Sequence, residues 1–423
     1  MTSRSIVIVG GGFAGTTLVR RLQRRLPADT ALTLISEEST TTFNPLLPEA
    51  VGAAIFPEQA VAPIRAMLTP ATRFIMGRVT CIDASRRTLE CQTLAGNREI
   101  AYDDLVLAFG SRARLDLVPG MAEHALPLKT VGDALHIRNT VLRRVARIEL
   151  ETDPRLRREL GHFVVIGGGF SGVEVAGMLA DSLVGIAPYY PRVAREELKV
   201  TVLQDLDRLL PELPARLGRA ALGSLAKRGV DVRLGMRAGA LDEQGVRLAD
   251  GQFIHAATVI STIGTRPNPL VESAGLPLER GRIRVAADLS VPGHAGLWAI
   301  GDCALVPNAL DGSYAPPTAQ FAVAQAKWLA RNLVQGVLQG EQRAFRHRSR
   351  GMMAAIGHLN GVAQVFGLSL SGLPAWLLWR AYYLSQMPTL GRKLRLLVEW
   401  TWGMFFAADI THLRFTRSRE PRP

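Results

Sequence analysis

The sequence predicts an α/β protein with two similar domains, the second inserted in the first, followed by a helical C-terminal region. Two glycine-rich segments of nearly the same sequence support this prediction, residues 6–15 and 163–172. Each is a β-branched apolar run that meets Gly-x-Gly-x-x-Gly and continues as a stretch of small and apolar residues. A strand, a glycine turn and a helix in this order begin a Rossmann-like dinucleotide-binding domain. A third observation, a tail that mixes tryptophans with arginines, indicates the C-terminal region.

The glycines of both segments suit a bound pyrophosphate. The first glycine allows the tight turn, the second lets the backbone approach the phosphates, and the third lets the helix pack close to its strand. The helix N-terminus then offers free N–H groups to the anion. Two such loops predict two bound dinucleotides, and two dinucleotides facing each other predict electron transfer between them. The predicted contacts are Gly10, Gly12, Phe13, Ala14 and Gly15 in the first segment, and Gly167, Gly169, Phe170, Ser171 and Gly172 in the second.

Composition limits the class of protein. With 423 residues the chain is too long for one core, which predicts two or three domains. A hydrophobic share of 48% and a charged share of 21% are typical of a globular protein. The three cysteines include no Cys-x-x-Cys pair, so we expect neither a disulfide framework nor a redox dithiol, and a reducing, intracellular compartment is the simplest interpretation. The first strand begins at Ile6, which leaves no room for a signal sequence, and no apolar run has membrane-spanning length.

The net charge of +13 indicates an anionic partner or a solvated basic surface. The arginines are scattered along the chain. Nucleic acid is disfavoured as the partner, because no zinc-finger spacing, helix-turn-helix pattern or aromatic-basic interleaving supports it. An anionic membrane surface and a phosphorylated ligand remain.

The first domain offers a ribose contact at the end of its second strand. Residues 5–9, 32–36 and 105–109 are predicted as buried parallel strands, and residues 13–26 as the helix after the first. Glu37 follows the second strand where a carboxylate can accept hydrogen bonds from the ribose hydroxyls of an adenosine. The alternative is a solvated charge in a loop.

Other segments of the first domain suit the rest of a dinucleotide. A proline-stiffened apolar loop containing Pro45 and Leu46 can lie against a flat ring, and Gly110 forms a turn after the third strand. A later strand closes on Gly301 and Asp302, whose N–H groups and carboxylate suit a ribityl chain or pyrophosphate. The alternative there is an ordinary turn. The adjacent Cys303 is predicted to be a small buried residue.

A helix that opens after a double proline carries three further candidates, Ala319, Gln320 and Gln325. Its N-terminal N–H groups can face the pyrimidine edge of a flavin. Both glutamines could equally be surface residues.

In the second domain, a helix at 172–184 and a strand at 198–203 follow the glycine loop. Gln204 ends this strand where a carboxylate would accept ribose hydroxyls. A neutral residue removes the repulsion that Glu would impose on a 2′-phosphate, so the nucleotide is NADPH, NADH or both. Gly264 forms the turn after the strand at 258–263.

The C-terminal part has a different character. Residues 373–415 mix large apolar side chains with cations, and four of the six tryptophans lie there. A pair of amphipathic helices with basic flanks suits insertion into one leaflet of a membrane. A dimer interface and a helical lid on the core are the alternatives.

Beyond these patterns, the chain resembles the type II NAD(P)H dehydrogenases, single-subunit FAD-dependent NAD(P)H:quinone oxidoreductases. The resemblance covers nearly the whole length. The two glycine fingerprints are shared with many flavoprotein reductases, and the helix beginning Ala-Gln together with the tail is more specific. The segments that carry it are 6–15, 43–47, 105–111, 128–130, 167–174, 288–294, 299–302, 319–322, 370–372, 375–379 and 399–402.

The resemblance implies FAD in the first domain, NADH or NADPH in the second, and quinone at the C-terminal helices. It implies that Glu174 is the acidic residue near the nicotinamide and that Gln320 lies beside the flavin and the quinone head. Gln325 keeps the second position of the family's closing pair, while Ala324 replaces the first. Gln204 departs from the carboxylate that accompanies NADH preference. The implied catalytic residues are Glu174, Gln320 and Gln325.

The expected domains are an FAD-binding domain at 1–125 and 285–340, a nucleotide-binding domain at 126–284 and a membrane-associating region at 341–423. The expected function is hydride transfer from NAD(P)H to FAD and electron transfer to a membrane quinone without proton pumping, with no metal. The expected location is the inner leaflet of an anionic membrane, on the cytoplasmic side, and a homodimer is compatible with the tail. The rivals are a reductase of a small electron-carrier protein, a sulfide:quinone reductase and a non-catalytic flavin sensor.

Overall fold

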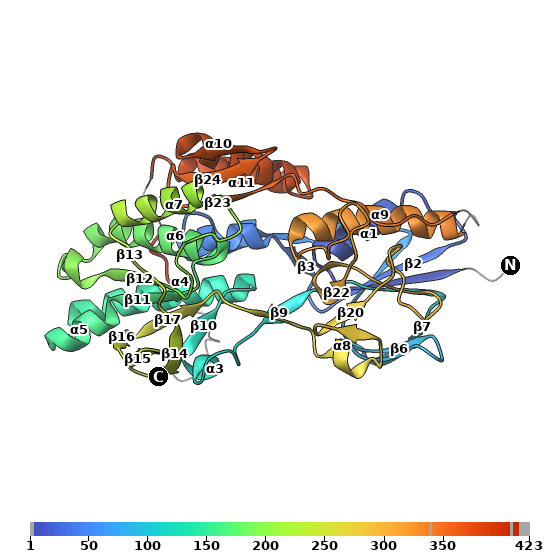
Figure 1. Ribbon diagram of the computed structural model, residues 1–423, viewed down its shortest axis with the longest axis horizontal. Helices are drawn as coiled ribbons and strands as arrows, with labels where there is room; N and C mark the ends of the chain where they lie inside the picture. The colour runs from blue at the N-terminus through green and yellow to red at the C-terminus, as the bar shows by residue number, and fades with distance from the viewer. Residues whose placement is uncertain (1–3, 338–340, 407–408, 414–423) are drawn as a thin grey trace. The chain divides into compact units, whose positions relative to one another are not determined.

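The computed structural model describes residues 4–337, 341–406 and 409–413, and these divide into two compact units (Figure 1). The N-terminal glycine loop lies in unit 1 and the second glycine loop in unit 2. The expected domain boundaries at 125 and 284 stay predictions, while the compact units change over at 112/113 and 264/265. Unit 1 comprises Met1–Thr42, Val61–Arg112 and Thr265–Arg350; unit 2 comprises Phe43–Ala60, Ala113–Gly264 and Gly351–Pro423.

Unit 1 is built on a seven-stranded sheet in the order β21-β8-β1-β2-β5-β6-β7. The first five strands are parallel, as expected for strands that are buried on both faces. The last two continue the sheet as an antiparallel meander, because the long strand β5 extends past the parallel region. The bounds are β1 (Ser5–Val9), β2 (Ala31–Ser36), β5 (Thr72–Asp83), β6 (Thr88–Thr93), β7 (Gly96–Ala101), β8 (Asp104–Leu107) and β21 (Leu297–Ala299).

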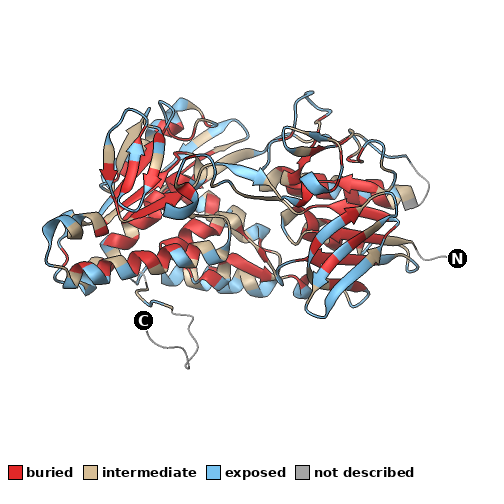
Figure 2. Cartoon of the chain, turned by 90° about the horizontal axis from the view of Figure 1, so that it is seen from below, coloured by how far each residue is buried: buried red, intermediate tan, exposed pale blue. Residues whose placement is uncertain are grey.

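Two long helices of unit 1, α1 (Phe13–Leu22) and α9 (Ala319–Val337), pack against each other (Figure 1). The parallel strands are buried, as Figure 2 shows, and form one apolar core with α1 and α9. Smaller elements complete the unit: β3 (Thr40–Thr42), β4 (Val61–Pro63), α8 (Leu270–Ser273), β19 (Leu278–Glu279), β20 (Arg282–Arg284), β22 (Ala304–Leu305) and the 3-10 helices η3 (Arg65–Met67) and η6 (Gly301–Cys303).

Unit 2 repeats the plan with a five-stranded parallel sheet in the order β10-β17-β11-β12-β13. A capping box at Thr130 begins the long helix before the glycine strand, since its hydroxyl accepts from Asp133 N and the Asp133 carboxylate accepts from Thr130 N. The bounds are β10 (Ala125–Pro127), α4 (Val131–Leu150), α5 (Pro154–Leu160), β11 (His162–Ile166), α6 (Phe170–Ile186), β12 (Lys199–Gln204), α7 (Ala215–Lys227), β13 (Asp231–Leu234) and β17 (Thr258–Ser261).

Unit 2 also carries two small antiparallel sheets and the C-terminal helices. One sheet contains β14, β15 and β16, and the other contains β23, β24 and β25, on which α10 packs (Figure 1). The bounds are η1 (Asn44–Leu46), α2 (Leu47–Val51), η2 (Pro57–Ala60), α3 (Met121–His124), η4 (Ala187–Tyr189), η5 (Arg195–Glu197), β14 (Ala238–Asp242), β15 (Gly245–Leu248), β16 (Phe253–His255), β23 (Gly351–Ala355), β24 (Gly361–Val365), β25 (Leu368–Ser371), α10 (Leu373–Gln386) and α11 (Leu390–Trp402). Two further strands remain: β9 (Ser111–Ala113) begins in unit 1 and ends in unit 2, and β18 (Thr265–Pro267) belongs to unit 1.

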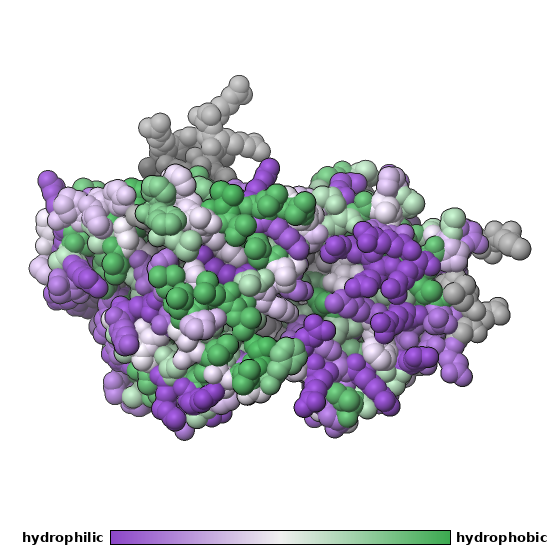
Figure 3. Space-filling model, turned by 90° about the horizontal axis from the view of Figure 1, so that it is seen from above, coloured by the Kyte–Doolittle hydropathy of each residue, from purple (hydrophilic) through white to green (hydrophobic). Residues whose placement is uncertain are grey.

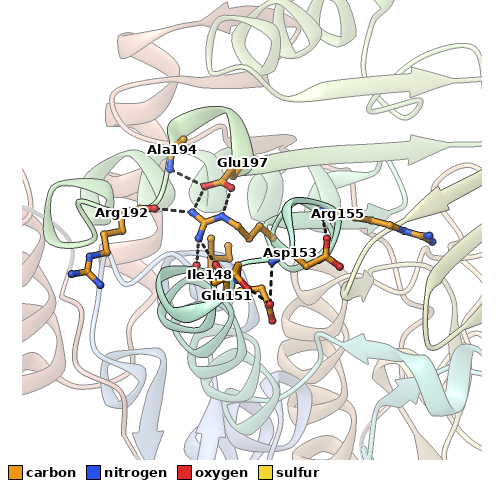
Figure 4. Close-up of polar contacts among 9 residues, drawn as sticks. Ile148, Glu151, Asp153, Arg155, Arg192, Ala194 and Glu197 are labelled. Atoms are coloured by element: carbon orange, nitrogen blue, oxygen red, sulfur yellow. Dashed lines mark hydrogen bonds and ion pairs between the residues drawn. The ribbon is translucent and has the colours of Figure 1, made fainter.

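The insertion between α6 and β12 is held by one arginine (Figure 4). Arg157 on α5 forms a two-pronged ion pair with Glu197, at 2.6 Å and 2.8 Å, and donates to the carbonyl oxygens of Ile148, Glu151 and Arg192. It therefore joins the C-terminal end of α4, where carbonyl groups lack helical partners, to the insertion. The ion pair with Glu197 also raises the pKa of the Arg157 guanidinium.

The predicted helical pair at the C-terminus is confirmed as α10 and α11, and it leaves apolar side chains exposed. Figure 3 shows apolar side chains gathered over the part of unit 2 that carries these helices. A shallow groove on α11 and the turn after it is lined by Leu397, Val398, Thr401, Trp402, Phe405 and Phe406. After this turn, residues 409–413 return to α4, where Arg138 pairs with Asp409 at 3.2 Å.

Among the described residues, one helical stretch, Phe170–Tyr189, is long and apolar enough to cross a membrane. It contains α6, the helix after the second glycine loop, and 67% of its most apolar window is buried inside the protein.

Candidate functional site

The first glycine loop forms a tight turn between β1 and α1. Gly10 has φ +121°, and a side chain there would overlap the backbone at Ala108. A side chain at Gly15 would overlap the Gly10 carbonyl oxygen, so α1 starts in direct contact with the turn. At Gly12, by contrast, an added Cβ would meet no protein atom within 4 Å. The loop is thus closed toward the protein and open on the side where a phosphate would approach the helix N-terminus.

Glu37 lies at the end of β2, as predicted. Its side chain is half exposed and pairs with Arg112 at 3.3 Å and Arg78 at 3.4 Å. These two arginines were missed at the sequence level, because their partner lies at a distant position in the chain. They keep a carboxylate in place beside the loop and leave it accessible for hydroxyl groups.

The Gly301–Asp302 turn lies in the same unit and follows β21. Asp302 Oδ2 accepts from the Ser111 hydroxyl at 3.0 Å, and Gly301 N donates to Gln325 Oε1 at 2.7 Å. Gln325 is therefore buried and braces this turn, and its catalytic role stays a prediction. Cys303 is fully buried, as predicted, and burial raises the pKa of its thiol to about 12, which makes it unreactive.

Ala319 and Gln320 begin α9, as the double proline predicts. Gln320 Oε1 accepts from Arg350 N at 3.1 Å. Gly110, with φ +65°, lies beyond β8 with no protein atom within 4 Å of an added Cβ. Unit 1 thus contains the first glycine loop, the Gly301–Asp302 turn, Glu37 and the start of α9.

The second glycine loop repeats the geometry of the first. Gly167 has φ +112°, and a side chain at Gly172 would overlap the Gly167 carbonyl oxygen. Gly169 again has no protein atom within 4 Å of an added Cβ. Phe170 and Ser171 open α6 directly after it. The second and third glycines thus have the same surroundings in both units, while a side chain at the first would meet the backbone at Ala108 in unit 1 and the side chains of Thr262 and Ile263 in unit 2.

Gln204 lies at the end of β12, as predicted, but its side chain turns inward. It is 5% exposed, its Oε1 accepts from Gly168 N at 2.8 Å, and its Nε2 donates to Arg208 O at 3.3 Å. Gln204 therefore holds the glycine loop in place through the hydrogen bond from Gly168 N. The charged residues that follow it, Asp205 and Asp207, are exposed beside this strand end.

Three other candidates also lie in unit 2. Gly264 has φ +73° and ends the turn after β17, where a side chain would overlap Leu117. Pro45 and Leu46 form η1, and Leu46 is fully buried. Their contact with a flat ring stays a prediction.

Glu174 lies on the second turn of α6 and is 7% exposed. Its Oε1 accepts from Ala355 N at 3.0 Å. Burial raises the pKa of this carboxyl to about 8, with a smaller contribution from Glu49. Glu174 can therefore carry a proton near neutral pH, which the sequence alone did not reveal because α2 and β23 are distant along the chain.

Two glycine cradles, each at the switch from a parallel strand to a helix, define a dinucleotide-dependent oxidoreductase. The pyridine nucleotide-disulphide oxidoreductase model matches residues 4–326, and the chain belongs to this family. The type II NADH:quinone oxidoreductase NdhA of Mycobacterium tuberculosis is 30% identical over 420 residues, covering 95% of this chain and 87% of the relative. Its counterpart Ndh from the same organism is 29% identical over 414 residues, covering 94% and 87%.

These relatives place the chain among the type II NADH:quinone oxidoreductases, as the resemblance implied. The structure of NDH2 from Plasmodium falciparum in complex with NADH matches the fold with a TM-score of 0.90. At 17% identity it covers 97% of this chain and 100% of that one. The predicted two-domain α/β fold is confirmed.

Proposed function

We propose that this chain oxidises NADH or NADPH through bound FAD and passes two electrons to a quinone at a membrane, without pumping protons. The observation that supports this most strongly is the pair of open cradles at Gly12 and Gly169, one in each unit. A side chain at either position would fill the space beside the backbone N–H groups that a pyrophosphate needs. Both loops therefore fit a dinucleotide, and the family assignment supports FAD in one and the nicotinamide nucleotide in the other.

Unit 1 would hold FAD. The loop at Gly10, Gly12, Phe13, Ala14 and Gly15 would bind its pyrophosphate, Glu37 its ribose, and the Gly301–Asp302 turn its ribityl chain. Ala319 and Gln320, at the start of α9, would offer N–H and amide groups to its ring. When bound, the flavin supplies the two-electron chemistry, accepting hydride from the nicotinamide and delivering electrons to the quinone.

Unit 2 would bind the nicotinamide nucleotide. Its loop residues would face the pyrophosphate, and Gln204 itself would add no negative charge at the ribose end, beside which Asp205 and Asp207 are exposed. Because Gln204 is already bonded to Gly168, the open ribose site would tolerate either a hydroxyl or a 2′-phosphate. Glu174 would hold an exchangeable proton for the reaction.

The C-terminal helices would dock on the inner leaflet of an anionic membrane, on the cytoplasmic side. The apolar groove on α11 and the basic residues of α11, Arg392, Lys393 and Arg395, support this assignment. A homodimer in the membrane is compatible with it.

Stopped-flow spectroscopy tests the proposal. Purified protein should be yellow and should bleach anaerobically on mixing with NADH or NADPH, and a soluble menaquinone or ubiquinone analogue should restore the colour. Bleaching without reoxidation by quinone would favour a reductase of a carrier protein, and no bleaching by either nucleotide would favour a flavin sensor. Gln204→Glu should shift the preference toward NADH, and an unchanged ratio would remove Gln204 from the specificity argument.

A further inference from the structure

Unit 2 buries two carboxylates and one guanidinium where α2, α6 and the C-terminal helices meet. Glu49 on α2 is 1% exposed and Glu174 on α6 is 7% exposed. The side chain of Arg380 on α10 is 14% exposed. We call these three residues the carboxylate cluster. A buried charge is costly unless it is paired, so the number of charges in the cluster constrains its protonation.

Arg380 is clamped between two indole rings. Its guanidinium carbon lies 3.8 Å from the ring centre of Trp376 and 4.8 Å from that of Trp400. Such stacking stabilises a cation that has been removed from water. Arg380 Nη2 then faces Glu49 Oε1 at 3.6 Å.

Two interactions stabilise the ionised form of Glu49. Its Oε2 accepts from the indole Nε1 of Trp400 at 2.6 Å, and Arg380 faces its other oxygen. Burial raises the pKa of the Glu49 carboxyl, and both Arg380 and Trp400 oppose this rise. The hydrogen bond and the cation favour the charged form of Glu49 over that of the other carboxyl.

Glu174 has weaker support for a charge. It accepts from Ala355 N, its side chain adjoins Trp379, and the negative charge of Glu49 raises its pKa further. The titratable group that faces it from α10 is Tyr383, whose pKa is raised by burial and by Glu174, so the phenol stays neutral. Around Glu49, Glu399 on α11 accepts from Phe56 N, and Arg138 on α4 is paired with Asp409.

Two carboxylates and one cation leave one negative charge uncompensated unless one carboxyl is protonated. We propose that Glu49 and Arg380 are positioning residues that form the ion pair of this cluster and keep its one exchangeable proton on Glu174. Oxidation of NADH releases a hydride, which carries two electrons and one proton. Reduction of a quinone to a quinol takes up two electrons and two protons, so one further proton must be supplied. Only this last use of the proton rests on the proposed function.

An infrared pH titration of the purified full-length protein tests the charge assignment without nucleotide or quinone. The signal is the carbonyl stretch of a protonated carboxyl group, and Glu174→Gln identifies the Glu174 band by removing it. Glu49→Gln removes the like charge and leaves Arg380 unpaired, so the Glu174 proton affinity should fall about tenfold or more. Arg380→Met removes the cation, so the titration should move to higher pH or a second band should appear.

The double variant Glu49→Gln/Arg380→Met removes a neutral pair, so its midpoint should return to within about threefold of the wild type in proton affinity. Glu58→Gln on η2 and Arg395→Met on α11 are matched exposed controls and should change nothing. If Arg380→Met does not fold, Arg380→Lys keeps the charge and should keep the wild-type midpoint. The proposal is overturned if Glu49→Gln leaves the band unmoved, or if both single variants shift it the same way.

Discussion

Gly12 and Gly15 lie one turn apart in the first cradle, but their surroundings differ. An added Cβ at Gly12 meets open space, and one at Gly15 meets the Gly10 carbonyl oxygen. Gly12→Ala should therefore leave the stability of the flavin-free protein unchanged and weaken FAD retention about tenfold or more. Gly15→Ala should lower the melting temperature, because the helix must move away from the turn. Flavin absorbance and thermal unfolding of flavin-stripped protein measure both, and equal effects of the two changes would contradict this division.

The protonation of Glu174 should be visible as a pH-dependence of stability. A carboxyl whose pKa is about 8 in the folded protein stays protonated while its unfolded counterpart ionises. Its contribution to stability is complete at pH values below the unfolded pKa and is lost as the pH rises toward 8. Within that window each pH unit costs at most about 1.4 kcal/mol. Above pH 8 the loss is constant.

Glu174→Gln mimics the protonated side chain and should lose this dependence. Urea unfolding of both proteins between pH 5 and pH 9 should show the variant gaining stability over the wild type as the pH rises. A constant difference between the two curves would mean that Glu174 is already ionised at low pH.

Sequence patterns located the glycines, Glu37, Gln204 and Asp302 at the ends of the predicted strands, because the glycine fingerprint fixes its own local structure. They did not reveal that Gln204 turns back to Gly168 or that Glu49 lies near Glu174. Both facts depend on tertiary contacts between segments that are distant in the sequence.

Among the elements, α5 depends on one side chain for its connection to the α6–β12 insertion. Arg157→Ala removes the ion pair with Glu197 and the donors to three carbonyl groups (Figure 4). We expect the melting temperature to fall by several degrees and the insertion to become more sensitive to proteolysis. Arg155→Ala is the matched control, since that arginine is exposed and pairs with Glu159 of the same helix at 2.9 Å. Equal melting temperatures for the two variants would show that the clamp adds no stability.

Element prediction succeeded for the buried, largely apolar runs. The strands β1, β2, β8 and β12 each lie within one or two residues of the predicted ranges 5–9, 32–36, 105–109 and 198–203. The helix predicted at 13–26 ends at Leu22, because the chain turns there toward Pro27. The sheet of β23, β24 and β25 was missed, since its strands are short, rich in small residues and separated by glycine turns that resemble loop sequence.

For the whole molecule, the tail was predicted from its composition and from the family resemblance, which indicate exposed apolar surface but not how the tail is anchored. The anchoring depends on pairs that join distant segments of unit 2, including Trp400 with Glu49 and Arg138 with Asp409. No spacing rule in the sequence connects these partners. These polar contacts therefore attach the tail to the rest of unit 2 and hold its apolar side chains at the surface.

Membrane attachment should depend on the apolar end of α11 and should be separable from nucleotide oxidation. Trp402, Phe405 and Phe406 are 61%, 76% and 53% exposed, and burying such side chains in a bilayer interface contributes roughly 1.5–3 kcal/mol each. Replacing all three with serine should abolish co-flotation with vesicles of phosphatidylglycerol and phosphatidylethanolamine. Flavin reduction by NADH in detergent should stay at the wild-type rate.

The matched control replaces three exposed leucines outside the tail, Leu94, Leu150 and Leu310, with serine. It should float with the vesicles as the wild type does. Flotation of the tail variant at the wild-type level, or loss of flotation in the control, would assign the membrane contact to a different surface. Loss of flavin reduction in the tail variant would instead show that α11 supports the fold of unit 2, because Trp402 follows closely on the residue that donates to Glu49.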